Sequence, residues 1–74
     1  MVIVGILTIS DRASVGEYED LSGPAIEAWL QKSISSSFRA IRRIVADGID
    51  PVANALRTLC DTECADLVLT TGGT

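Results

Sequence analysis

The sequence predicts an α/β fold built on a parallel sheet, and three observations lead to this fold class. Strand-like runs occur at residues 2–9, 38–45 and 67–71, with helical patterns between them. The first run is almost entirely apolar, which is typical of a strand buried on both faces. Each connection is long enough for a helix, and such crossovers join parallel strands in a right-handed sense. We therefore expect the order β-α-β-α-β and half of a doubly wound sheet with strand order 2-1-3.

The run at residues 2–9, VIVGILTI, is expected to be the central strand of this sheet. β-branched residues dominate it and Gly5 lies inside it, and both features disfavour a helix. The strand is expected to end at Ser10, Asp11 and Arg12. The polar residues that follow are typical of an ordered loop.

One apolar face predicts the first helix. Its members repeat at helical spacing: Ile26, Trp29, Leu30 and Ile34. Trp29 is accordingly expected in the core. Asp20 and Ser22 are both candidate N-caps, and Pro24 suits the first turn because its missing N–H has no partner there.

Residues 38–45, FRAIRRIV, fit either a strand or a helix by pattern, and we predict a strand. Phe38, Ala40 and Ile44 would share one face, which Arg42 interrupts. A charged residue in that position is typical of an edge strand.

The second helix is predicted after the loop ADGIDP. Asp50 is expected to be its cap, with Pro51 at the first helical position. An apolar face follows at helical spacing: Val52, Ala55, Leu56 and Leu59. Residues 67–71 then form a short buried strand.

Composition argues against several classes of function. The net charge is −4 and the pI is about 4.4, which disfavours binding to nucleic acid or to an anionic membrane. No charged n-region followed by an h-region opens the chain, so no targeting segment is expected. No stretch approaches the roughly 20 apolar residues of a membrane span. Cys60 and Cys64 lack a second pair, and on a helix they would share a face. We expect them to be reduced thiols at the margin of the core of a cytoplasmic protein.

Candidate binding residues gather where the parallel strands end. Ligands in open α/β sheets bind at the carboxyl edge, at the switch point between two strands, here the first and the third. This arrangement places Ser10, Asp11 and Arg12 beside the TTGGT segment at residues 70–74. Asp47 follows the second strand at the same edge. An anionic small molecule is the ligand class that suits such a site.

Most of these residues have both a structural and a functional interpretation. Gly72 and Gly73 would either end a strand with a positive-φ turn or let backbone N–H groups approach a phosphate. The hydroxyl groups beside them belong to Thr70, Thr71 and Thr74. Arg12 would be a surface arginine or an anion clamp. Asp47 would be a turn former or a ligand for Mg²⁺ that bridges phosphates.

The remaining polar residues favour positioning over acid–base chemistry. Asp11 is interpreted as orienting Arg12 or capping the loop, and Asp20 and Ser22 as helix caps rather than ligands. The chain has no histidine, which removes the commonest general base from it. Charge stabilisation by a metal ion, as in phosphoryl or nucleotidyl transfer, fits better.

Two segments resemble a known family. TISDRASVGEYEDLSGPAI, at residues 8–26, and LVLTTGGT, at residues 67–74, are similar in order and spacing to the molybdopterin adenylyltransferases, which include the gephyrin G domain. The resemblance covers the chain from Val2 to Thr74. It implies a three-layer α-β-α fold with the doubly wound sheet of that family, and a homotrimer for the full-length protein.

The resemblance also implies the chemistry. Enzymes of this family use ATP and Mg²⁺ to adenylylate molybdopterin, with release of pyrophosphate. Asp47 matches a catalytic aspartate, here also the expected ligand of Mg²⁺. The residues implied in substrate binding are Ser10, Asp11, Arg12, Asp20, Ser22, Thr70, Thr71, Gly72, Gly73 and Thr74. A molybdate-insertion protein is a further implied partner.

In the family, the TTGGT loop continues through another glycine to an Arg-Asp pair whose aspartate is also catalytic. We therefore expect residues 1–74 to be the N-terminal part of one domain, ending inside this loop and inactive alone. Two alternatives stay open: a non-catalytic molybdopterin-binding or scaffold module of the same fold, and a flavodoxin-like binder. Domains of the molybdotransferase and competence-damage types carry a different turn where this chain has Ser10, Asp11 and Arg12.

Overall fold

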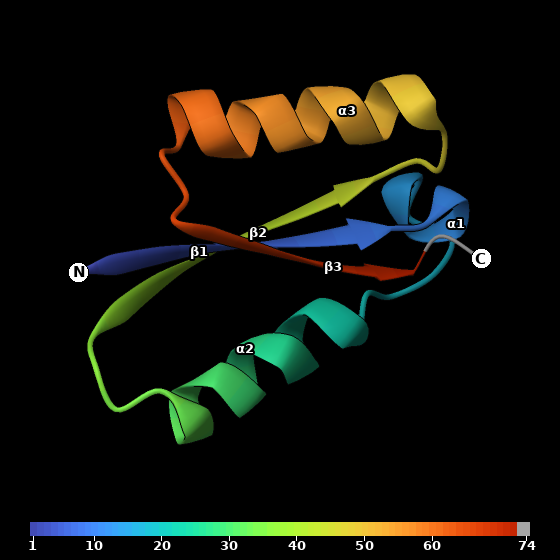
Figure 1. Cartoon of the computed structure of the whole chain (residues 1–74). Coiled ribbons are helices and arrows are strands. Elements are labelled where there is room, and N and C mark those ends of the chain that lie inside the picture. Colours follow the sequence, from blue (N-terminus) through green and yellow to red (C-terminus); the bar gives the residue numbers. More distant parts are fainter. Residues whose placement is uncertain (73–74) are drawn as a thin grey trace.

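The computed structural model describes residues 1–72 of the chain (Figure 1). Its elements are, in order, β1 (Val2–Ile9), α1 (Asp11–Ser14), α2 (Ser22–Ser33), β2 (Phe38–Val45), α3 (Ile49–Arg57), the π-helical turn η1 (Thr58–Thr62) and β3 (Leu67–Gly72). The predicted order of strands and longer helices is confirmed. Within residues 1–72, no helix combines the length and the apolar composition that crossing a membrane requires.

The three strands form one parallel sheet in the order β2-β1-β3, which confirms the predicted topology. Pairing of β1 with β2 begins at Val2 opposite Phe38, and pairing with β3 begins at Val4 opposite Leu67. Both ladders extend to Ile9. Figure 1 shows α3 on one face of the sheet and α2 on the other. The carboxyl ends of all three strands therefore share one edge, beside α1.

Two apolar clusters hold these layers together, because successive side chains of β1 point to opposite faces of the sheet. Val4 and Ile6 are fully buried and pack with Leu30 of α2. Leu7 is fully buried on the other face, where it packs with Leu59. The central strand thus contributes to both clusters, as its continuous apolar sequence predicts.

The prediction that Trp29 lies in the core is wrong, because the residue is 62% exposed. Ile26, Leu30 and Ile34 are the α2 residues that pack in the cluster beneath this helix. They are spaced by four residues and form a narrow row. Trp29 is one position before Leu30, about 100° around the helix, and so falls outside that row.

The polar segment after β1 contains the helical turn α1, where a loop was predicted. Ser10 begins it, because its hydroxyl accepts a hydrogen bond from the N–H of Ala13 at 3.2 Å. Such a side-chain cap replaces one of the backbone partners that the first turn lacks. The serine at this strand end therefore starts a turn instead of an extended loop.

The second long helix, α3, begins earlier than predicted. Gly48 is its N-cap, so Asp50 lies within the first turn and Pro51 is the third helical residue. The prediction of Asp50 as cap is therefore wrong. Gly48 has a φ of 135°, a conformation that favours glycine, and this lets the chain enter the helix at once. The predicted apolar face of this helix is confirmed.

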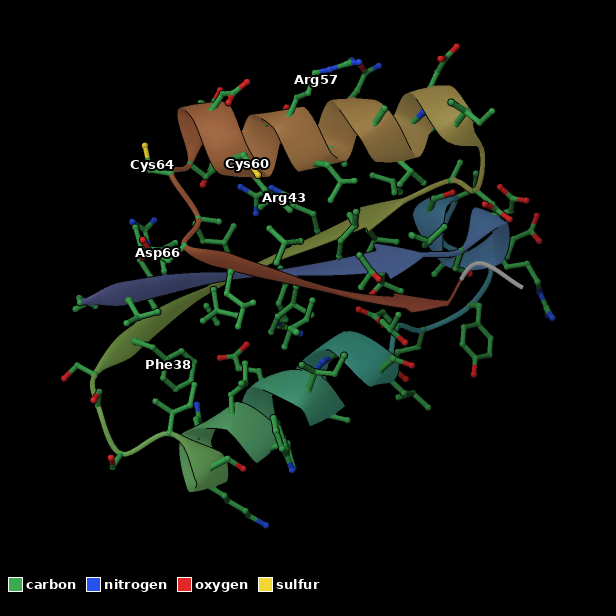
Figure 2. All side chains as sticks on the ribbon, viewed as in Figure 1. Phe38, Arg43, Arg57, Cys60, Cys64 and Asp66 are labelled. Atoms are coloured by element: carbon green, nitrogen blue, oxygen red, sulfur yellow. The ribbon has the colours of Figure 1, made fainter. Side chains whose placement is uncertain are left out.

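The two cysteines are free thiols and both are exposed, so the prediction that they pack at the margin of the core is wrong. Figure 2 shows them at the end of the helical segment that lies far from α1. Cys60 lies within η1, whereas Cys64 follows it with a φ of 58° and shares no helix face with it. Their neighbours Leu59 and Ala65 occupy the positions that pack in the core.

Candidate functional site

A pocket opens at the edge of the sheet where the three strands end. Its volume is about 510 Å³, within the range typical of small-molecule sites. Most of the residues predicted from sequence line it: Ser10, Asp11, Arg12, Asp20, Ser22, Asp47, Thr71 and Gly72. Thr70 does not line it, because alternate residues of a strand face opposite ways. Gly73 and Thr74 lie outside the described residues.

The exit of β1 supplies one wall of the pocket. The hydroxyl of Ser10 is engaged in capping α1, and the hydroxyl of Ser14 donates to the backbone carbonyl of Asp11 at 2.8 Å. These bonds hold the first turn after the strand. Asp11 and Arg12 extend from this turn, and both line the pocket.

Asp47 is 36 residues from Asp11 in the sequence, but a hydrogen bond joins it directly to this turn. Its backbone N–H donates to Oδ1 of Asp11 at 3.0 Å. The Oδ1 atom of Asp47 accepts a hydrogen bond from the N–H of Gly48 at 2.8 Å. Within residues 1–72, the second carboxylate oxygen of Asp47 makes no hydrogen bond. In the described part of the chain, the backbone N–H of Asp47 is therefore hydrogen-bonded, while one of its carboxylate oxygens has no hydrogen-bond partner.

Asp20 uses both of its carboxylate oxygens within the protein. Oδ1 accepts from the N–H of Gly23 at 3.1 Å, near the start of α2. Oδ2 accepts from the hydroxyl of Thr8 at 3.1 Å, at the end of β1. A Cβ at Gly23 would lie 2.5 Å from Oδ2, so a larger residue there would displace the Asp20 carboxylate. Asp20 thus ties α2 to β1, in line with the helix-capping interpretation.

Ser22 makes no side-chain capping bond. It is the first residue of α2, and Leu21 precedes it as the N-cap residue. The structure therefore assigns the capping contact to Asp20 and leaves the Ser22 hydroxyl at the pocket.

Arg12 is the one cationic side chain among the described residues that line the pocket. Its guanidinium carbon lies 5.6 Å from the centroid of the Tyr18 ring, which is a cation–π contact. Within residues 1–72 it forms no ion pair, so its charge is not neutralised by a protein carboxylate. The described residues therefore form no salt bridge with Arg12, and both the solvated surface arginine and the anion clamp fit its exposed position.

Gly72 ends β3 with a φ of 89°. A Cβ at this position would run into the backbone carbonyl oxygen of Ile9 on the neighbouring strand. Glycine is therefore required here by the pairing of β3 with β1, whatever the ligand. The positive-φ interpretation of this glycine is confirmed, and a role in phosphate binding would be additional.

Sequence reasoning missed two polar residues of the pocket. Thr8 is only 6% exposed and reaches the pocket at the end of an otherwise apolar strand. Tyr18 lies in the polar segment before α2 and is 52% exposed. An aromatic residue in a polar loop six positions after an arginine is the signal that was available for Tyr18.

Negative charge exceeds positive charge in the pocket. Asp11, Asp20 and Asp47 line it together with the single cation Arg12. Among the described residues, no group of three or more acidic, cysteine or histidine side chains is arranged to hold a metal ion. A cation bound here would need oxygen ligands from a substrate or from water.

Comparison with known proteins identifies relatives of this chain. Residues 5–74 match the family described as "Probable molybdopterin binding domain". The chain is 46% identical over 71 residues to the molybdopterin adenylyltransferase of Helicobacter pylori (strain ATCC 700392 / 26695). The aligned region covers 96% of this chain and 40% of that protein. It is 41% identical over 71 residues to the molybdopterin adenylyltransferase of Escherichia coli (strain K12), covering 96% of this chain and 36% of that protein.

A relative from an animal shares the same region. The chain is 34% identical over 73 residues to the molybdenum cofactor synthesis protein cinnamon of Drosophila melanogaster, covering 99% of this chain and 12% of that protein. The chain therefore spans less than half the length of each of these curated relatives.

Proposed function

We propose, since this chain belongs to the molybdopterin-binding domain family, that it serves molybdenum cofactor biosynthesis as part of a molybdopterin adenylyltransferase. Relatives of that name match 96% of the chain at 38–46% identity. Because the chain spans only 36–40% of those proteins, the activity is proposed for the longer protein. Residues 1–74 would form the N-terminal part of its single molybdopterin-binding domain.

The pocket at the switch point between β1 and β3 is the observation that carries the proposal. Its volume of about 510 Å³ suits a ligand of the size of a nucleotide or a pterin. Arg12 would hold an anionic group, because a guanidinium matches the geometry of a phosphate. Thr71 and the backbone at Gly72 would contact the phosphate-bearing end of molybdopterin. Gly73 and Thr74, the last two residues of the TTGGT segment, are proposed to complete that contact.

The side chains of the pocket suit Mg²⁺ that arrives with a phosphate substrate. Carboxylates outnumber cations in the lining, and Asp47 keeps one carboxylate oxygen without a hydrogen bond in the described part of the chain. Mg²⁺ is commonly held by one or two carboxylates together with substrate phosphates and water. We therefore propose Asp47 as its ligand in this chain. The ion would reduce the repulsion between the phosphates and the carboxylates of the pocket.

The proposed reaction transfers AMP from ATP to the terminal phosphate of molybdopterin. A phosphate oxygen attacks the α-phosphorus of ATP, a new P–O–P bond forms, and the bond to the leaving pyrophosphate breaks. The chain has no histidine, so its residues would act by holding two anions in line and by balancing their charge. Arg12 and Asp47 would do this from two different loops of the pocket.

Three further properties are proposed from the family resemblance. The full-length protein would be a homotrimer, it would pass its product to a molybdate-insertion protein, and it would work in the cytoplasm. The two exposed free thiols, Cys60 and Cys64, suit a reducing compartment. Sedimentation of the full-length protein tests the trimer.

The substitution Asp47→Asn in the full-length protein tests the proposed function. We expect turnover of ATP and molybdopterin to fall about 10²- to 10³-fold, as when a single preorganised electrostatic group is lost. Binding of molybdopterin and the unfolding temperature should stay near the wild-type values. Pyrophosphate release and binding of the pterin are the two measurements. Asp50→Asn is the matched control. Asp50 is exposed in the first turn of α3, three residues after Asp47, and does not line the pocket.

Three outcomes separate the possible functions. Unchanged turnover in Asp47→Asn would return Asp47 to the role of a turn residue. Molybdopterin binding without any pyrophosphate release by the wild-type protein would instead support a non-catalytic binding or scaffold module. Binding of FMN in place of molybdopterin would support a flavodoxin-like binder.

A further inference from the structure

One side-chain hydrogen bond joins the two loops that carry Asp11 and Asp47. Asp11 opens α1 directly after β1, and Asp47 follows β2, 36 residues later. The backbone N–H of Asp47 donates to Oδ1 of Asp11 at 3.0 Å. Both residues line the same pocket. The bond therefore sets how two parts of one pocket lie relative to each other.

Within residues 1–72, few other hydrogen bonds act near the Asp47 peptide, and one of them joins the N–H of Val52 to the carbonyl of Gly48 in the first turn of α3 at 3.2 Å. Next to the Asp47 peptide, the contact between β1 and β2 ends where the N–H of Ser10 donates to the carbonyl of Val45 at 2.8 Å. Gly48, on the other side of Asp47, has a φ of 135° and no Cβ to restrict it. The bond from the Gly48 N–H to Oδ1 of Asp47 lies within the loop itself. Among the described residues, Asp11 is the only side chain outside this loop that hydrogen-bonds to the Asp47 peptide.

Asp11 is a suitable anchor because its own backbone is held. Ser10 accepts a hydrogen bond from Ala13, and the hydroxyl of Ser14 donates to the carbonyl of Asp11. These bonds fix the turn from which the Asp11 carboxylate extends. Its position therefore follows that of the end of β1, which is the most buried strand of the sheet.

We propose that Asp11 is a positioning residue, which holds Asp47 at the pocket by accepting the hydrogen bond of its N–H. This inference rests on the role proposed above for Asp47. Asp11 acts here through an oxygen that accepts a hydrogen bond, and neither its charge nor contact with the substrate is needed. Asp11→Asn keeps such an oxygen, whereas Asp11→Ala removes it.

Steady-state kinetics of the full-length enzyme test this proposal. We expect Asp11→Ala to lower kcat about 10- to 100-fold, the range for a misplaced catalytic group, with the KM for molybdopterin near that of the wild type. Asp11→Asn should recover most of the lost kcat. In a protein that already carries Asp47→Asn, Asp11→Ala should cause little further loss, because the two residues act as a unit. Asp61→Ala is the control, since Asp61 is exposed in η1 and lies outside the pocket.

Several results would overturn the proposal. Equal losses in Asp11→Ala and Asp11→Asn would show that the charge of Asp11 is required, as for a direct ligand of metal or substrate. Additive losses with Asp47→Asn would show that Asp11 acts independently. A wild-type kcat for Asp11→Ala beside a low kcat for Asp47→Asn would refute this inference alone. A wild-type kcat for Asp47→Asn would refute the proposed role of Asp47, and this inference with it.

Hydrogen exchange provides a second measurement, which does not depend on turnover. In the wild-type enzyme, the amide of Asp47 should exchange more slowly than an amide without a hydrogen bond. Loss of this protection in Asp11→Ala and its return in Asp11→Asn would support the proposal. An unprotected Asp47 amide in the wild-type enzyme would overturn it.

Discussion

The two outer strands of the sheet pair with the same central strand but differ in charge. The sequence of β2 contains Arg39, Arg42 and Arg43, whereas that of β3 contains no charged residue. Arg42 lies 3.1 Å from a carboxylate oxygen of Glu27 on α2. Arg43 lies 3.3 Å from a carboxylate oxygen of Glu63, just after η1. The two ion pairs therefore connect β2 to helical segments on opposite faces of the sheet.

The difference in charge indicates which edge of the sheet faces solvent. Charged residues on an outer strand oppose pairing with a further strand. β2 has this protection, while β3, with the sequence LVLTTG, has the composition of a strand with neighbours on both sides. Within residues 1–72, β3 pairs with β1 alone. The contrast supports the proposal that these residues are part of a larger domain whose sheet continues beyond β3.

The largest effect is expected when the 74-residue chain is made by itself. We expect it to associate through the uncharged edge of β3 and to show no adenylyltransferase activity, because it spans at most 40% of the bacterial relatives. Analytical ultracentrifugation and pyrophosphate release are the measurements. A monodisperse chain with a sharp thermal transition and measurable turnover would contradict the prediction.

A matched pair of substitutions assigns the association to an edge. Leu67→Lys adds a charge at the start of β3, where Leu67 is 46% exposed, and should reduce association. Arg39→Leu removes an exposed charge from β2 and should increase it. Equal association in both variants would show that the edge strands do not control it.

A smaller effect is expected at the end of β3. Gly72→Ala in the full-length protein should lower the free energy of unfolding by more than the roughly 1–3 kcal/mol of a strained positive φ, because its Cβ also meets the Ile9 carbonyl. Gly16→Ala is the matched control, since Gly16 has a φ of 80° and open space around its Cβ position. Urea unfolding measures both. Equal losses in the two variants would show that the contact with Ile9 relaxes at no cost.

Most of the fold could be predicted because its patterns are local. The apolar run of β1 fits only a strand buried on both faces, and the spacing of apolar residues in α3 fits only a helix. Which residues of a helix are buried depends on the side of the helix that faces the sheet. Trp29 and Leu30 are neighbours in sequence, yet only Leu30 is buried by the sheet. The start of α3 depends on the backbone of Gly48, which pattern alone does not reveal.

The candidate site was predictable for a different reason. Parallel strands bring their carboxyl ends together, so the residues after each strand could be assigned to one edge without knowing any contact. The contacts themselves could not be predicted. The bond between Asp11 and Asp47, and the packing of Arg12 on Tyr18, depend on how separate turns lie in space. Asp20 reaches Thr8 for the same reason.

The smallest effect is expected at the charged edge. A double-mutant cycle of Arg43→Ala and Glu63→Ala in the full-length protein should give a coupling of about 0.2–1 kcal/mol, typical of exposed ion pairs. The Arg43 side chain is 47% exposed, so solvent weakens its attraction to Glu63. Urea unfolding at low and high salt measures the coupling, which should fall as salt rises. A coupling well above this range that salt does not change would mean that another segment of the longer protein covers β2. Both edges of the sheet would then be interior, and the contrast between the two strands would not hold.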